Sequence, residues 1–306
     1  MKKITTLYLC CLLFIFSNSA NAGYTQTKYP IVLAHGLMGF DDVLGVDYFY
    51  RVPASLSRDG AQVFVTAVSS LNNSEQRGEQ LLQQVEQIIA LTGTTKVNLI
   101  GHSQGAQSIR YVASLRPDLV ASATSVGGVN FGSPVADVVR QGLTPGSKLE
   151  GIAKTAFDAF GGLIALLSGN SQLPQDALGA LESLTTEGAL AFNQKYPEGL
   201  PAEQCQQGPM YASNGVYYFS WSGTRTLTNI FDPSDAALAI TAILIPGDDD
   251  GLVSRCSSHL GYVLKDNYRM NHLDEVNQLI GFHHLFTTDP LTVYRQHANR
   301  LKKLGL

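Results

Sequence analysis

The chain has 306 residues, and 44% of them are hydrophobic, which is enough for one large α/β domain or two small ones. Its 21 Lys and Arg stand against 25 Asp and Glu, a net charge of −4, and no basic patch is visible along the chain. This charge pattern argues against nucleic acid as a partner.

The first 22 residues have the pattern of a secretory signal. Lys2 and Lys3 form a basic start, residues 7–16 are apolar, and Ala20-Asn21-Ala22 is a cleavage pattern. The apolar run is too short to span a bilayer. We therefore expect a protein that is secreted to the extracellular space by way of the periplasm.

Removal of the signal would leave residues 23–306, a chain of 284 residues with 19 Lys and Arg against 25 Asp and Glu, a net charge of −6. Two cysteines remain, Cys205 and Cys256. An oxidising compartment permits them a single pairing. The alternative is two buried free thiols, which we do not expect outside the cytosol.

A strand that turns directly into a helix is predicted near the middle of the chain. Residues 97–100 are an apolar run with the length of a buried strand, and residues 106–115 carry apolar side chains at helical spacing. Between them lies Gly101-x-Ser103-x-Gly105, which in this context is the nucleophile elbow of an α/β-hydrolase. The glycines let strand and helix approach, and the turn lifts the Ser hydroxyl out of the sheet. A plain strand–helix turn would also use glycine, but the strand before and the helix after favour the elbow.

Strands and helices alternate along much of the rest of the chain. This alternation predicts an α/β-hydrolase fold with a mostly parallel, doubly wound sheet. The expected strands are residues 29–37, 62–68, 119–126, 215–223 and 242–246, and the expected helices are residues 78–91 and 293–304.

Residues 142–197 interrupt this alternation. A strongly apolar helical stretch at 149–167 includes Ile152, and Gly161-Gly162 in its middle would serve as a hinge. An ordinary core helix is one interpretation. The length of the insertion favours a lid whose apolar face covers the site in water and opens on a lipid surface. We expect a single domain over residues 23–306 with this helical lid embedded in it.

The strand at 29–37 ends in His35-Gly36. In α/β-hydrolases such a loop supplies one backbone N–H of the oxyanion hole, which here would be that of Leu37, and Gln104 would supply the second. Gly36 lets the loop bend toward the substrate. His35 precedes Ser103, which is the wrong order for the catalytic base, so we expect it to be structural.

An acidic turn is the expected place for the acid of a catalytic triad, because the chain order in this fold is Ser, then Asp, then His. The turn contains Asp248, Asp249 and Asp250, and the pattern alone does not choose among them.

The base must be a later histidine within hydrogen-bonding reach of Ser103. His272 lies at a predicted junction of loop and helix and is favoured, with His259 next. His297 lies in a helix of mixed charge, where a solvated position is expected. Neighbours such as His283 and His284 point in different directions on a helix, which argues against a metal pair. All of these histidines follow the acidic turn.

At these residues the chain resembles the secreted bacterial triacylglycerol lipases of the Pseudomonas/Burkholderia type, over nearly the whole mature sequence. The matching stretches are residues 29–36, 45–48, 58–62, 97–103, 232–235, 250–253, 256–261 and 266–278.

The resemblance implies a nucleophile at Ser103, an acid at Asp250, where the Asp-Gly-Leu-Val match singles out one of the three aspartates, and a base at His272. It implies oxyanion-hole donors at Leu37 and Gln104, and a disulfide between Cys205 and Cys256. Many members of the family have His where this chain has Gln104. The donor is a backbone N–H, so the oxyanion hole should persist.

The resemblance also implies one structural Ca²⁺. Spacing alone says little, because Asp274 and Gln278 would merely share one helical face and Asp232 lies far away in sequence. Similar lipases bind the ion through carboxylates that match Asp232 and Asp274 and through main-chain oxygens that match Gln278 and Phe282. Oxygen ligands suit this hard cation. The ion would tie the loop of His272 to the core. The H-E-x-x-H pattern of zinc proteases is absent from the sequence.

The expected function is hydrolysis of long-chain carboxylic esters at a lipid–water interface through an acyl-enzyme. Some members of the family need a dedicated folding chaperone, which makes such a chaperone a candidate partner. An esterase of soluble short-chain esters, or an acyltransferase with the same triad, is the alternative enzyme. A third hypothesis is a secreted binding protein on the same scaffold, and the intact Ser103, Asp250 and His272 argue against it.

Overall fold

The computed structural model describes residues 23–37, 48–142 and 173–306, together with residues 146, 150–152, 154–155 and 158. The expected signal, and residues 159–167 of the apolar stretch that we expect to be a lid, lie outside the described residues. Within the described part of the chain, no helix combines the length and the apolar content that a membrane crossing requires.

Six parallel strands form one sheet in the order β2-β1-β3-β4-β5-β6. This sheet confirms the expected α/β fold. Strand β3 lies in its middle, and every residue of β1, β3 and β4 is buried, as expected of parallel strands covered on both faces. The strands are β1 (Ile31–Ala34), β2 (Val63–Thr66), β3 (Val97–His102), β4 (Val120–Val126), β5 (Tyr217–Gly223) and β6 (Tyr262–Tyr268).

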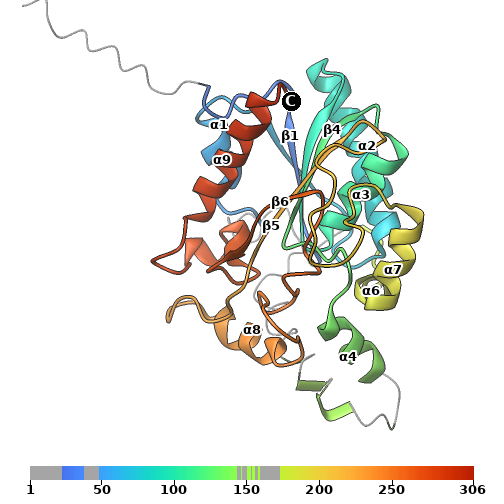
Figure 1. Ribbon diagram of the computed structural model, residues 1–306, viewed down its shortest axis with the longest axis vertical. Coiled ribbons are helices and arrows are strands. Elements are labelled where there is room, and N and C mark those ends of the chain that lie inside the picture. The colour runs from blue at the N-terminus through green and yellow to red at the C-terminus, as the bar shows by residue number, and fades with distance from the viewer. Residues whose placement is uncertain are drawn as a thin grey trace, which may run out of the picture.

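Helices cover both faces of the sheet (Figure 1). Helices α1 (Val52–Ser57) and α9 (Pro290–Lys303) lie on one face, and α2 (Ser74–Thr92) and α3 (Gly105–Leu115) lie on the other. Because successive strand side chains point to opposite faces, Leu33 of β1 packs with α1 and α9, whereas Val32 packs with α2 and α3.

The shorter helices lie beyond the carboxyl ends of the strands or beside them (Figure 1). These helices are α4 (Pro134–Gly142), α6 (Ala177–Leu184), α7 (Thr186–Lys195) and α8 (Ser234–Ala242), and two 3₁₀ turns follow at η1 (Asp274–Val276) and η2 (Leu279–Gly281).

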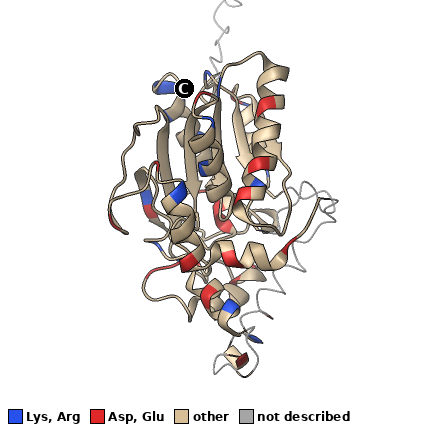
Figure 2. Cartoon of the chain, turned by 90° about the vertical axis from the view of Figure 1, so that its right-hand side faces the viewer, with Lys and Arg blue, Asp and Glu red and all other residues tan. Residues whose placement is uncertain are grey.

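Acidic and basic residues are interspersed over the face that Figure 2 turns to the viewer.

The predicted strand at 242–246 is wrong. Helix α8 ends at Ala242, and the chain continues in turns in which the Leu244 and Ile245 N–H groups donate to the carbonyls of Thr241 and Ala242. The apolar run there is the end of a helix, because a short apolar run does not distinguish a strand from a buried helix end. The acidic turn therefore follows a helix.

The last strand of the sheet is β6, which the sequence analysis did not predict. It carries Lys265, Asp266 and Asn267, and only Val263 and Tyr268 of its seven residues are buried. An edge strand pairs on one side only, so its sequence can be polar. Its carboxyl end leads directly to the loop of His272.

His297 is buried, and the expectation of a solvated position is wrong. It lies on the face of α9 that packs on the sheet, where its Nε2 is hydrogen-bonded to Thr124 Oγ1 at 2.8 Å and its ring contacts Trp221. Val293 and Leu301 are buried at helical spacing from it, so the periodicity of the helix contained the signal.

Candidate active site

Ser103 occupies a strained turn at the carboxyl end of β3. Its φ of 57° lies in the left-handed region, which a residue with a side chain seldom adopts. An added Cβ at Gly101 would overlap the Gly105 carbonyl, and one at Gly105 would overlap the Ala34 carbonyl. The two glycines therefore allow helix α3 to begin against strands β1 and β3, as an elbow requires.

Asp250 and His272 form a buried hydrogen-bonded pair. His272 Nδ1 lies 2.8 Å from Asp250 Oδ2, and the His272 N–H donates to the Asp250 carbonyl at 2.9 Å. The N–H groups of Leu252 and Val253 donate to Asp250 Oδ1. Because the carboxylate accepts the Nδ1 proton, Nε2 of His272 is left as the basic nitrogen.

The two neighbouring aspartates have other partners. Asp248 forms an ion pair with Arg255 at the surface, and Asp249 accepts the N–H of Gly251. Burial raises the pKa of Asp249 to about 6. Of the three aspartates, Asp250 is the one that bonds a histidine among the described residues.

The imidazole of His272 lies close to the elbow. Its ring centroid is 4.5 Å from that of His102, the residue before Ser103. The His272 carbonyl accepts a hydrogen bond from His102 Nε2 at 2.9 Å. The fold thus brings together residues 102–103 and 272, which are 170 positions apart.

Leu37 and Gln104 flank the elbow. Leu37 packs beside Val129 and Val253, and Gln104 is fully buried at the start of α3. Neither backbone N–H donates to an acceptor within the described residues. The Gln104 side chain donates to the Asn72 carbonyl and the Ser74 hydroxyl near the start of α2. It therefore bonds the start of α2 and not the loop that carries Leu37.

His35 has structural contacts. Its Nε2 accepts the Val68 N–H at 3.1 Å, and Arg77 donates to the carbonyls of His35 and Gly36. Burial, with the nearby Arg77 charge, lowers the pKa of His35 to about 3, so the ring is neutral. These contacts hold the end of β1.

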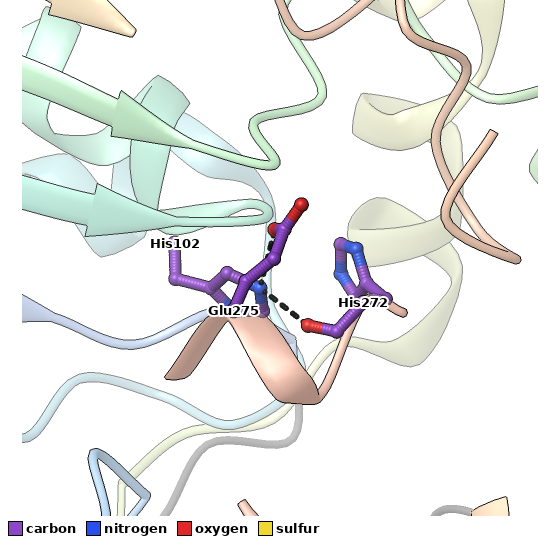
Figure 3. A group of neighbouring side chains, drawn as sticks. All are labelled: His102, His272 and Glu275. Carbon is purple, nitrogen blue, oxygen red and sulfur yellow. Dashed lines mark hydrogen bonds and ion pairs between the residues drawn. The ribbon is translucent and has the colours of Figure 1, made fainter. Parts of the chain in front are cut away.

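Glu275 is a site residue that the sequence analysis missed. It is buried, and it lies beside the imidazoles of His102 and His272 (Figure 3). Its Oε2 is 3.4 Å from His102 Nε2. Burial, together with the Asp250 charge, raises the pKa of Glu275 well above its ordinary value. The signal that was available is its place three positions after His272, on the first turn after the base.

His102, His272 and Glu275 also have potential ligand atoms within 4.8 Å of one another. The two nitrogens of His102 are already engaged, Nδ1 with the Tyr48 hydroxyl and Nε2 with the His272 carbonyl. This cluster is therefore a hydrogen-bond network, because a metal ligand needs an available lone pair on nitrogen.

The other histidines lie in different surroundings. His259, the second candidate for the base, bonds Asp266 at 3.0 Å and the Gln206 carbonyl. The imidazoles of His283 and His284 make local contacts within residues 281–286. The structure also contains the disulfide between Cys205 and Cys256, which the resemblance implies.

Carboxylates gather behind the loop of His272, where the resemblance implies Ca²⁺. Asn271 joins three of them: its side-chain amide donates to Asp235 Oδ1 at 2.8 Å and to Asp232 Oδ2 at 3.5 Å, and its N–H donates to Asp274 Oδ2. Asp235 was not among the predicted ligands. Gln278 does not share a helical face with Asp274, because Asn277 between them is left-handed and ends η1.

The chemistry of this cluster fits a cation. Burial, with repulsion from Asp232 and Asp235, raises the pKa of Asp274 well above its ordinary value. Within the described residues, no hydrogen bond of normal geometry reaches the buried Asp274 Oδ1, and no Lys or Arg forms an ion pair with the three carboxylates. A hard divalent cation would supply the missing positive charge.

Comparisons with known proteins identify the fold. The family model described as alpha/beta hydrolase fold matches residues 29–275. A lipase of Bacillus licheniformis in its mature form superposes with a TM-score of 0.62 at 16% identity, over 90% of this chain and 93% of that one. EstA of Clostridium botulinum gives 0.62 at 18% identity, over 92% and 88%. At these identities the structures show the fold alone, which is that of an α/β hydrolase.

Sequence relatives are more specific. The chain is 60% identical to the triacylglycerol lipase of Vibrio cholerae, over 93% of this chain and 91% of that protein. It is 42% identical to that of Pseudomonas fragi, over 92% and 98%, and 40% identical to that of Burkholderia plantarii, over 92% and 88%. The chain belongs to the α/β-hydrolase family and, within it, to the Pseudomonas-type triacylglycerol lipases, so it is a lipase, a hydrolase.

Proposed function

We propose that this lipase hydrolyses long-chain carboxylic esters through a Ser-His-Asp triad of Ser103, His272 and Asp250. The observation that carries the proposal is the buried 2.8 Å bond between His272 and Asp250, on a loop that is bonded to the residue before Ser103. The strained φ of Ser103 supports its role as the nucleophile, because such strain at an elbow presents the hydroxyl.

In the proposed mechanism, the Ser103 hydroxyl attacks the ester carbonyl while His272 Nε2 takes its proton. Asp250 holds the imidazole in the required tautomer and stabilises the imidazolium. His272 then protonates the leaving alcohol, which departs and leaves an acyl-enzyme. Water, deprotonated by His272, attacks this ester, and release of the fatty acid returns the proton to Ser103.

The N–H groups of Leu37 and Gln104 would hold the negative oxygen of each tetrahedral intermediate. Their lack of other acceptors within the described residues supports this assignment. A preorganised donor of this kind typically contributes about 10²–10³ in kcat.

We further propose that the substrate is reached at a lipid–water interface after movement of the lid, and that the protein is secreted. The similarity to triacylglycerol lipases supports such a substrate. The basic and apolar start of the chain, with its Ala-x-Ala pattern, supports secretion.

We also propose one structural Ca²⁺ at Asp232 and Asp274, with the main-chain oxygens of Gln278 and Phe282. The buried Asp274 Oδ1, which no hydrogen bond of normal geometry reaches within the described residues, supports this site. A bound Ca²⁺ would neutralise carboxylates that border the loop of His272. Asp235 would not be a direct ligand of the ion, because its oxygens already accept hydrogen bonds from Thr228, Asn229 and Asn271.

The Ser103→Ala variant tests the triad. We expect hydrolysis of emulsified triacylglycerol to fall by about 10⁶-fold, the loss typical when the nucleophile of such a triad is removed. A fluorophosphonate probe should label the wild type at Ser103 and leave the variant unlabelled. The matched control is Ser108→Ala, which removes a buried hydroxyl of helix α3 that has no hydrogen-bond partner among the described residues. Activity of Ser103→Ala near that of the wild type would refute the assignment.

A further inference from the structure

A chain of buried hydrogen bonds crosses the site and involves none of the three triad side chains. The Gly36 N–H donates to the Tyr48 hydroxyl at 3.1 Å, and this hydroxyl lies 2.6 Å from His102 Nδ1. His102 Nε2 lies 2.9 Å from the His272 carbonyl oxygen, a contact drawn in Figure 3. Tyr48, His102 and His272 are each 3% exposed or less.

The chemistry of these groups determines which atom donates and which accepts in each hydrogen bond. A carbonyl oxygen only accepts, so His102 Nε2 must carry hydrogen. Burial, with the neighbouring His272, lowers the pKa of His102 well below its ordinary value, so the ring is neutral and Nδ1 is an acceptor. The Tyr48 O–H must then donate to Nδ1, and its oxygen accepts the Gly36 N–H. With a neutral ring, each of the three contacts then pairs one donor with one acceptor.

The nearby Glu275 does not change this direction. Its Oε2 lies 3.4 Å from His102 Nε2, farther than the His272 carbonyl oxygen, which is the nearest acceptor for the Nε2 hydrogen. The tautomer with hydrogen on Nε2 is therefore compatible with both neighbours.

This series of hydrogen bonds joins the three segments that the reaction needs. Gly36 precedes Leu37, the proposed oxyanion-hole donor, His102 precedes Ser103, and His272 is the proposed base. Close packing points the same way, since a Cβ added at Gly36 would lie 2.6 Å from Ser103 Cβ and 2.8 Å from the Tyr48 hydroxyl. The contacts span 54 and 170 positions of sequence, so they fix segments that nothing local holds together.

We propose that His102 and Tyr48 are positioning residues that set the oxyanion loop, the nucleophile and the loop of the base at their working separations through this directed chain. The inference rests on the proposed triad mechanism. Acyl transfer depends on such separations, and a displacement of about 1 Å can cost about 10²-fold in rate. Neither residue touches the reacting atoms.

The decisive variant is Tyr48→Phe, which removes one oxygen and leaves the Gly36 N–H and His102 Nδ1 without partners. We expect kcat on a soluble ester to fall about ten- to a hundredfold while KM changes by less than about twofold. The rate of labelling by a fluorophosphonate should fall in parallel, because it reports attack by Ser103 alone.

The matched control is Tyr218→Phe. Tyr218 is fully buried, and its hydroxyl accepts a hydrogen bond from Asn214 at 2.9 Å in the core that packs on α2 and α3. This variant should lower the free energy of unfolding by about 1 kcal/mol and leave kcat unchanged. A merely structural role of Tyr48 would give the same result as this control.

The His102→Gln variant tests the two hydrogen bonds of His102 separately. The amide of Gln can donate to the His272 carbonyl from the position of Nε2 but offers no acceptor at the position of Nδ1. We expect partial retention of kcat, and Tyr48→Phe should cost much less in the His102→Gln background than in the wild type, since the contact it breaks is already lost. If His102→Gln does not fold, Tyr48→Phe against Tyr218→Phe decides.

The outcomes distinguish this inference from the proposed function. A wild-type protein that neither hydrolyses esters nor reacts with the probe would overturn both. A reactive wild type with a Tyr48→Phe variant whose kcat lies within about twofold of it, or whose loss lies only in KM, would overturn the positioning role alone. Fully additive costs in the double variant would likewise show that Tyr48 does not act through His102.

Discussion

Several side chains of this lipase have properties that their neighbours impose and that their residue type does not reveal. His35, His102 and His297 are all neutral because burial lowers the pKa of each. His272 belongs to the same residue type, yet its Nδ1 bonds the Asp250 carboxylate and its ring lies 4.5 Å from that of His102. The role of each histidine follows from its partners.

The sequence identified the triad candidates from chain order and from the match to a family, and the structure pairs Asp250 with His272. Chain order could not reveal the hydrogen-bond partners of His102 and Tyr48. Their signal is spatial, because Tyr48 bonds His102 across 54 positions and His102 bonds the His272 carbonyl across 170 positions.

Burial of His297 predicts a pH dependence of stability. Its pKa is lowered well below the ordinary 6.5 by burial and by Arg300. The unfolded chain therefore binds a proton that the native state does not bind, and the free energy of unfolding falls as the pH drops below about 6.5. Each such group contributes a slope of about 1.4 kcal/mol per pH unit. In His297→Gln the slope between about pH 6.5 and 5 should decrease by that amount, as urea unfolding at several pH values would measure.

Thr124→Val is the control for this experiment. It removes the same 2.8 Å hydrogen bond without removing a titrating group, so it should lower stability by about 1 kcal/mol at every pH and keep the wild-type slope. Equal slopes for His297→Gln and the wild type would contradict the prediction.

At the scale of elements, the elbow depends on how closely α3 approaches β1 and β3. The sequence located this strand–turn–helix unit, because its signals are local: an apolar run, two glycines and a helical period. The strand predicted at 242–246 was wrong and β6 was missed, because an apolar helix end resembles a buried strand and an edge strand need not be apolar.

Gly105→Ala tests the close approach. A Cβ at this position would overlap the carbonyl oxygens of Ala34 and His35, both of which are backbone atoms that cannot rotate away. We expect a loss of about 1–3 kcal/mol in the free energy of unfolding and a lower kcat, because α3 carries the Gln104 N–H. Gly151→Ala is the control for stability, since a Cβ there meets no atom of the described residues within 4 Å and should leave the free energy of unfolding unchanged. If Gly105→Ala leaves stability and kcat unaltered, neither quantity depends on the close approach of α3 to β1.

At the scale of the whole molecule, the cluster of Asp232, Asp235 and Asp274 connects α8 to the loop of the base. If Ca²⁺ binds there, its removal should lower stability and activity together. At a concentration 100-fold above its dissociation constant, the ion contributes about 2.7 kcal/mol. Exhaustive chelation should therefore lower the melting temperature by several degrees and reduce turnover, and Ca²⁺ but not Mg²⁺ should restore both.

Asp274→Asn makes the chelation experiment specific to this cluster. Burial disfavours the charged form of Asp274, so the neutral amide should melt at or above the temperature of the calcium-free wild type and should no longer respond to Ca²⁺. A wild type whose melting temperature and turnover both survive chelation unchanged would rule out the site.

The sequence by itself determined the class of fold, the elbow and the membership of the lipase family, because period, glycine placement and matched motifs are properties of short segments. The tertiary structure decided which histidines are buried, which aspartate bonds the imidazole, where the last strand lies and how Gly36, Tyr48, His102 and His272 connect. Those facts depend on contacts between residues that are far apart in the chain, and hydrogen-bond partners across such distances exist only once the sheet has brought its carboxyl ends together.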